Sequence, residues 1–208
     1  MPAYFSISFE LNKTKTAIKD FYKTLIAAGF VFKSGFWGCE NESFDEIVAW
    51  NQNNLDDDFE LGYNQHHSHD FKHILFDFSD FSEVRLYVDN QKKSATFILH
   101  LIIPEDDFLE WVTSDDKTIE RRKYEKMDLL KEFSKTVWNS VEILAIQTAW
   151  ECSNSPPRVK RISNYIHPQA EPFCILKESS VTEKLGLPFE KIGRNDVLVE
   201  DRDNWNYL

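Results

Sequence analysis

The sequence predicts an α+β fold in which helices flank a mixed, largely antiparallel sheet. Short segments with alternating apolar and polar residues indicate strands, and segments with apolar residues at helical spacing indicate helices. Three consecutive strands are joined by turns as hairpins. A regular strand–helix–strand order, as in a parallel sheet, is absent. The 208 residues suffice for one main domain with its own core.

Two strands and two helices are expected in the first 51 residues. Residues 3–10 alternate between apolar and polar side chains, and residues 30–36 form a second strand that ends at glycines. The segment between them has apolar residues at helical spacing and stops at Gly29. Ser43 and Glu46 form a capping-box pattern, which predicts a short helix reaching about residue 51.

Three strands are expected at residues 73–78, 83–88 and 95–103. Turn residues join them, so they are predicted to pair as antiparallel neighbours. Pro104 and the three acidic residues after it predict a short helix that buries Phe108, Leu109 and Val112. A longer helix is expected from about residue 118 to 140, followed by an interior strand at 142–150.

A change of composition after residue 152 suggests a boundary. Residues 1–152 are predicted to form the main α+β domain, and residues 153–208 a small C-terminal α/β extension packed on it. Strands are expected near 173–176, 189–192 and 197–199, with a helix over 180–186 between the first two. The basic run Arg158–Arg161 is interpreted as an exposed linker.

The charge and cysteine content exclude several classes of protein. A formal net charge of −11 disfavours direct binding to nucleic acids and to anionic membranes. Cys39, Cys152 and Cys174 lack the spacing of a disulfide framework or a zinc ribbon, and are interpreted as buried structural residues. No spanning segment or signal peptide is recognised, so a cytoplasmic protein is expected.

No catalytic motif is found, so no catalytic residue is assigned. The sequence has no nucleophile elbow, no Walker loop and no dinucleotide fingerprint. The 14% of aromatic residues are expected to be mainly core packing. These observations favour a protein that is not an enzyme and that needs no cofactor.

Four of the six histidines lie within eight residues, at His66, His67, His69 and His73. Imidazole and carboxylate groups are ligands for zinc, nickel or iron, so this cluster is a candidate metal site. A polar loop with surface histidines and a pH-sensitive surface are the two other interpretations. A metal-dependent enzyme that holds a divalent metal at this cluster is the first alternative to a binding protein.

The stretch between Lys33 and Lys72 holds nine acidic residues and no lysine or arginine. Such a field attracts basic partners, and aromatic side chains within it are typical of protein interfaces. The competing interpretation is a solvated acidic face over an aromatic core. The predicted partner-binding residues are Asp56, Asp57, Asp58, Glu60, Trp50 and Tyr63.

The sequence therefore favours a non-enzymatic protein-binding domain whose partner has a basic surface. A bacterial immunity protein that inhibits a basic toxin is the more specific hypothesis, and it rests on composition and on the acidic segment. A structural or accessory subunit is the second alternative.

Overall fold

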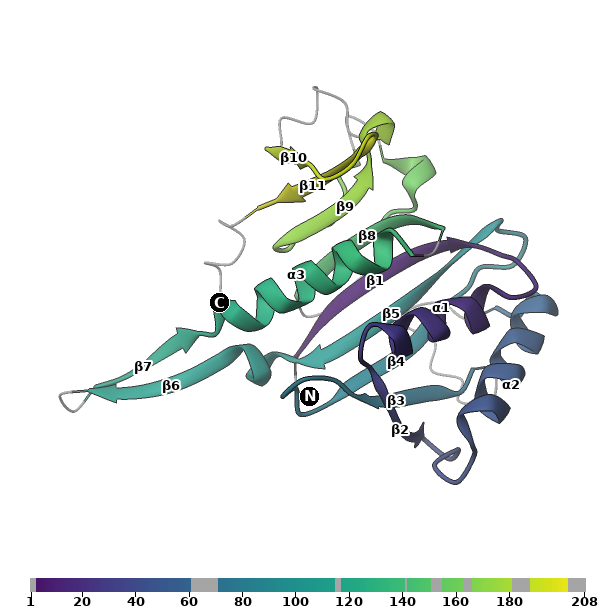
Figure 1. Ribbon diagram of the computed structural model, residues 1–208, viewed down its shortest axis with the longest axis horizontal. Helices are drawn as coiled ribbons and strands as arrows, with labels where there is room; N and C mark the ends of the chain where they lie inside the picture. Colours follow the sequence, from purple (N-terminus) through teal and green to yellow (C-terminus); the bar gives the residue numbers. More distant parts are fainter. Residues whose placement is uncertain are drawn as a thin grey trace.

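The computed structural model describes residues 3–60, 71–114, 117–140, 142–150, 155–162, 166–180 and 188–201. Within them, nine strands form one antiparallel sheet in the order β10-β11-β9-β8-β1-β5-β4-β3-β2 (Figure 1). The strands are β1 Tyr4–Asn12, β2 Val31–Phe36, β3 His73–Asp77, β4 Val84–Asp89, β5 Thr96–Pro104, β8 Ile143–Trp150, β9 Phe173–Lys177, β10 Phe189–Lys191 and β11 Asp196–Glu200. The fold is therefore the predicted α+β class.

The three α-helices of the described residues are α1 Ala17–Ala27, α2 Phe44–Asp56 and α3 Tyr124–Trp138. Helices α1 and α3 cover the same face of the sheet, because both pack on Phe9 of the central strand β1. The ring of Phe9 lies 4.9 Å from that of Phe21 in α1 and 6.2 Å from that of Phe133 in α3. The aromatic residues therefore lie largely in the core, as expected.

The opposite face of β1 is polar and yet buried. Ser6, Ser8 and Glu10 alternate with the apolar residues, and their exposed fractions are 3%, 3% and 2%. Part of the cover comes from the segment around the 3-10 turn η2, Val159–Arg161, whose Val159 amide donates to Glu10 over 2.7 Å. A buried carboxylate needs such donors, because an unpaired one would be costly.

Two helix predictions around residues 105–123 are wrong. Residues Glu105–Phe108 form only a 3-10 turn, η1, and are followed by the strands β6 Leu109–Ser114 and β7 Lys117–Arg122. The long helix α3 begins at Tyr124 and not near Thr118. Val112 pairs with the β-branched Ile119 across the two strands, so strand pairing prevails over the helical start signal at Pro104.

Strands β6 and β7 form a separate two-stranded hairpin. Figure 1 shows the hairpin extending away from the nine-stranded sheet and its helices. Its base is held by Phe108, which is fully buried against Phe5 and Trp150, with ring centroids 5.1 and 5.4 Å apart. The hairpin is thus a projecting arm on a well-packed base.

The described strands of the predicted C-terminal extension continue the main sheet. Strand β9 pairs with β8, and β11 pairs with β9. Phe173, Ile175 and Leu198 belong to the same buried cluster as the residues under α1 and α3. Residues 178–180 form the 3-10 turn η3, whereas most of the helix expected over 180–186 lies outside the described residues.

None of the helices in the described part of the chain has both the length and the hydropathy needed to cross a membrane.

Candidate functional site

Helix α2 presents one exposed stripe to solvent. Ser43 caps the helix, with its hydroxyl accepting from the Glu46 amide and the Glu46 carboxylate accepting from the Ser43 amide over 2.8 Å. Ile47, Val48 and Leu55 are buried. The side chains on the opposite face recur at spacings of four, three and four residues, which places them along one line of the helix. We call this line the α2 stripe, and it consists of the exposed residues Glu46, Trp50, Asn53 and Asp57.

Buried amide side chains fix the orientation of α2. Asn51 is fully buried, and its side chain bonds both backbone groups of Lys72: Nδ2 donates to the carbonyl and Oδ1 accepts from the amide, each over 2.8 Å. Gln52 accepts from the Ile18 amide over 3.0 Å at the start of α1. The helix is therefore tied to two neighbouring segments, and the α2 stripe is held in a fixed direction.

The ring of Trp50 packs against Lys72, which is paired with Glu42. The Nζ atom of Lys72 lies 4.2 Å from the centroid of the Trp50 ring and 2.6 Å from Oε1 of Glu42. A cation over an indole face is attracted by the ring quadrupole. Trp50 remains 44% exposed, so one face of the ring is packed and the other is open to a partner.

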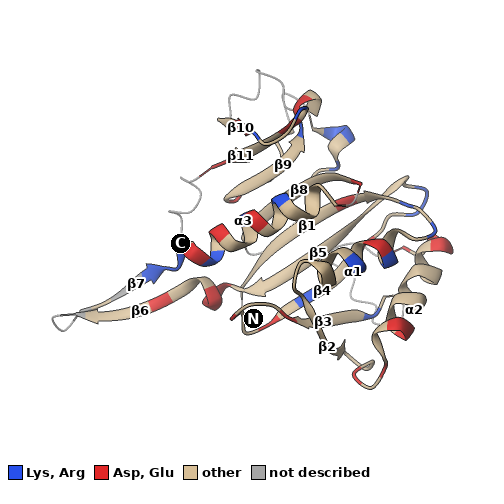
Figure 2. Cartoon of the chain, viewed as in Figure 1, with Lys and Arg blue, Asp and Glu red and all other residues tan. Residues whose placement is uncertain are grey.

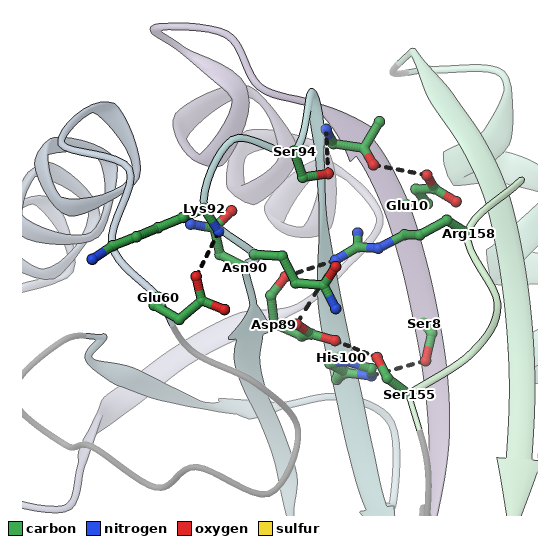
Figure 3. Close-up of polar contacts among 12 residues, drawn as sticks. Ser8, Glu10, Glu60, Asp89, Asn90, Lys92, Ser94, His100, Ser155 and Arg158 are labelled. Atoms are coloured by element: carbon green, nitrogen blue, oxygen red, sulfur yellow. Dashed lines mark hydrogen bonds and ion pairs between the residues drawn. The ribbon is translucent and has the colours of Figure 1, made fainter. Parts of the chain in front are cut away.

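The acids after α2 divide into two groups. Asp58 accepts from Lys13 Nζ and from the Lys93 amide at 2.8 Å, and the bond to Lys13 is the main reason that its pKa is lowered. Glu60 accepts from the Lys92 amide over 2.7 Å (Figure 3). Both therefore hold the turn between β4 and β5, which gives them a role within the fold.

Asp56 and Asp57 are exposed at the C-terminal end of α2. Asp56 accepts from Gln52 Nε2 over 2.9 Å, and none of the ion pairs between described residues includes either carboxylate. The last turn of α2 has no basic residue. The negative end of the helix dipole and two carboxylates thus coincide. Figure 2 shows acidic residues along α2.

Only one residue of the candidate histidine cluster lies within the described residues. His73 begins β3, and its ring lies 5.5 Å from that of Tyr87 and 5.0 Å from that of Trp37. Tyr63, His66, His67 and His69 lie outside the described residues. Among the residues that are described, no group of three or more His, Cys, Asp and Glu side chains is placed to hold a metal ion.

A second polar cluster is buried on the sheet face opposite α1 and α3 (Figure 3). Asp89 at the end of β4 accepts from the Ser155 hydroxyl and lies 3.7 Å from the Arg158 guanidinium. Burial raises the pKa of the Asp89 carboxyl and lowers the pKa of Arg158. Arg158 is only 6% exposed, so its interpretation as part of an exposed linker is wrong. The negative charges of Asp89 and Glu10 oppose this effect of burial and favour the charged form of the buried Arg158.

His100 on β5 lies in the same face, with Nδ1 2.9 Å from the Ser8 hydroxyl (Figure 3). Burial lowers the pKa of His100 to about 3, so the imidazole is neutral at physiological pH. Ser8 and His100 are 3% and 1% exposed. This buried hydroxyl–imidazole pair links the neighbouring strands β1 and β5.

The two cysteines in the described residues are free and buried, as expected for structural residues. Burial raises the pKa values of Cys39 and Cys174, which keeps both as thiols. Neither is therefore activated for nucleophilic chemistry.

No protein-family model and no curated protein matches the sequence. Among solved structures, the chain is similar to the Pseudomonas aeruginosa T6SS protein PA0821, with a TM-score of 0.43 and 8% sequence identity. The similarity covers 96% of this chain and 64% of that chain, so the present chain spans less than two thirds of its length. A similarity of this extent carries no inference about function.

Sequence reasoning missed the buried polar cluster. Ser8, Glu10 and His100 occupy alternate positions on strands whose other face is apolar, a pattern that usually indicates a solvent-facing side. The available signal was the chemistry of these residues, since a histidine inside the apolar run of β5 is unusual. Their burial depends on a segment about 150 residues away from Glu10, which no local pattern reveals.

Proposed function

We propose that the chain is a non-enzymatic binding protein that holds a basic protein on the α2 stripe. In the more specific form, it is an immunity protein that neutralises a basic toxin. The observation that carries the proposal is the combination of a supported, half-exposed Trp50 with Asp57, which is exposed and forms no ion pair with another described residue, on one line of α2.

The aromatic part of the stripe has the properties of an interface anchor. Tryptophan is enriched among the residues that dominate binding free energies, because its large ring can be fully desolvated by a partner. Lys72 and Asn51 already fix the ring and its helix, so binding would cost little side-chain entropy. The acids around it supply attraction for cations and faster association.

The acidic part of the stripe is unfavourable for stability. A carboxylate at a helix C-terminus is repelled by the dipole, and a basic residue is the usual choice there. Sites that violate a stability rule without local compensation are candidates for function. Asp57 fits this description, whereas Asp58 and Glu60 have amide donors and contribute to the fold.

The test uses the protein encoded by the gene next to this one as the candidate partner. We expect Trp50→Ala to weaken binding by about 30-fold, as for an interface hot spot. Asp57→Asn should weaken binding by about fivefold at low salt and reduce its salt dependence, because the lost contact is electrostatic. Asp57→Asn should also raise the free energy of unfolding by about 0.5 kcal/mol.

Matched controls lie on other surfaces. Tyr124→Ala removes an aromatic ring that is 54% exposed, and Asp106→Asn removes an exposed first-turn acid of η1. Both should bind as the wild type does at every salt concentration. Equal affinities for wild type, Trp50→Ala and Asp57→Asn would exclude the α2 stripe as the binding surface.

A further inference from the structure

Among the described residues, neither outer edge of the β6–β7 hairpin is paired with another strand. Within the described residues, β6 pairs only with β7, from Leu109↔Arg122 to Ser114↔Lys117. An isolated two-stranded hairpin is marginally stable in water, and three or more strands are usually needed. Trp111, in the middle of β6, is 68% exposed and is the most exposed large hydrophobic residue among those described. The arm is thus incomplete by itself.

The two edges differ in chemistry. Strand β7 has the sequence Lys-Thr-Ile-Glu-Arg-Arg, and charged residues on an edge strand oppose pairing with another chain. Strand β6 has the sequence Leu-Glu-Trp-Val-Thr-Ser, with one charge and three strong strand formers. The edge of β6 is therefore the one that can accept another strand.

We infer that β6 pairs antiparallel with β6 of a second copy of this chain, joining two hairpins into a four-stranded sheet. A twofold axis pairs a strand with its own copy in antiparallel orientation, which makes the contact self-complementary. Pairing centred on Trp111 sets the two indole rings opposite each other and places Glu110 opposite Val112 of the second copy. Aromatic cross-strand pairs of this kind stabilise sheets.

The distribution of charged residues also favours pairing through β6 over pairing through β7. Pairing β7 with itself about its middle would set Lys117 opposite Arg121 or Arg122 of the second copy, and like charges opposite each other destabilise a sheet. In β6 the only charged residue, Glu110, meets an uncharged one. The contact involves six residues from each copy and stays below the roughly 1,200 Å² of stable interfaces. The dimer is consequently weak and depends on concentration.

The experiment is sedimentation velocity of the full chain over a concentration series. The wild type is expected to shift from monomer to dimer as concentration rises. Trp111→Lys, at an exposed position, should raise the dissociation constant at least about tenfold, because it removes the ring pair and charges the edge. Thr113→Lys, also exposed on β6, should act in the same direction.

Thr118→Lys is the matched control, because it adds the same charge to the same hairpin on the exposed side of β7. It should dimerise as the wild type does, and circular dichroism should give the wild-type spectrum for all three variants. A wild type that is monomeric at every concentration would overturn the inference. Unchanged dimerisation of both β6 variants, or equal loss in Thr118→Lys, would also overturn it.

Discussion

At the residue scale, several polar side chains are buried on the sheet face that would normally be exposed to solvent. Glu10, Asp89, His100 and Arg158 are each less than 9% exposed. Each makes at least one contact with another part of the chain, such as the Val159 amide for Glu10 and the Ser8 hydroxyl for His100. Burying such groups is tolerable only with these partners, so the cluster ties the segment around residues 155–161 to one arrangement.

His100 makes stability depend on pH. Its pKa is about 3 in the folded chain, below the 6.5 expected when unfolded. The unfolded chain therefore binds a proton that the folded chain does not, so this stabilisation is complete above pH 6.5 and is lost as pH falls. From pH 7 to pH 5 the wild type should lose about 2 kcal/mol more than His100→Gln. Urea unfolding at both pH values measures the difference.

If His100→Gln and the wild type lose the same free energy between pH 7 and pH 5, then His100 is accessible to protons in the folded chain.

At the element scale, Asn51 is one of the two buried amide side chains that fix the direction of α2. Asn51 satisfies both the amide and the carbonyl of Lys72, at the entrance to β3. The Asn51 side chain thus makes the two hydrogen bonds that a neighbouring strand would otherwise make to the backbone of Lys72. Without it, two backbone polar groups would be buried with no partner.

Asn51→Ala should lower the free energy of unfolding by about 2–3 kcal/mol, since two buried hydrogen bonds are lost and their partners remain. Asn53→Ala on the exposed side of the same helix should change it by less than about 0.5 kcal/mol. Chemical denaturation of the two variants tests this. Similar losses in both would mean that helix propensity, and not the bond to Lys72, determines the stability of α2.

Elements with a single consistent signal could be predicted from the sequence. Strand β1 and helix α2 were correct to within a few residues, apart from the C-terminal end of α2, because alternation and the Ser43–Glu46 capping box each point to one structure. The helix predictions for residues 105–122 were wrong because the start signal at Pro104 is local, whereas residues 109–114 form a strand through their pairing with β7.

The candidate site was only partly predictable for a similar reason. Trp50 and Asp57 are exposed on α2, whereas Asp58 and Glu60 serve a turn more than thirty residues away. Composition locates charge along the chain, whereas its availability to a partner depends on tertiary contacts.

At the scale of the whole molecule, the sheet does not end where the composition changes. Strand β9 continues it from β8, and Phe173, Ile175 and Leu198 fill the main core. Removing these residues would open the edge of β8 and leave voids beside its apolar side chains.

A chain truncated to residues 1–152 should therefore lose the cooperative unfolding transition of the full chain. Exposed strand edges and an unfilled core favour loosely packed or aggregated states. Near-ultraviolet circular dichroism and thermal unfolding of both chains measure the effect. A truncated chain with the full-length spectrum and midpoint would establish residues 1–152 as an independent domain.

The central position of β1 also has a consequence during synthesis. Phe5 pairs with Ile103 on one side and with Trp150 on the other, so β1 is made long before both of its neighbours are available. At about 5–20 residues per second, the ribosome needs roughly 7 to 30 seconds to reach Trp150 after β1 is made. Throughout that interval, the nascent chain carries a strand with one apolar face that lacks at least one of its two partners. Productive folding therefore depends on keeping residues 4–12 from other nascent chains, so the yield of native protein should fall when expression is rapid.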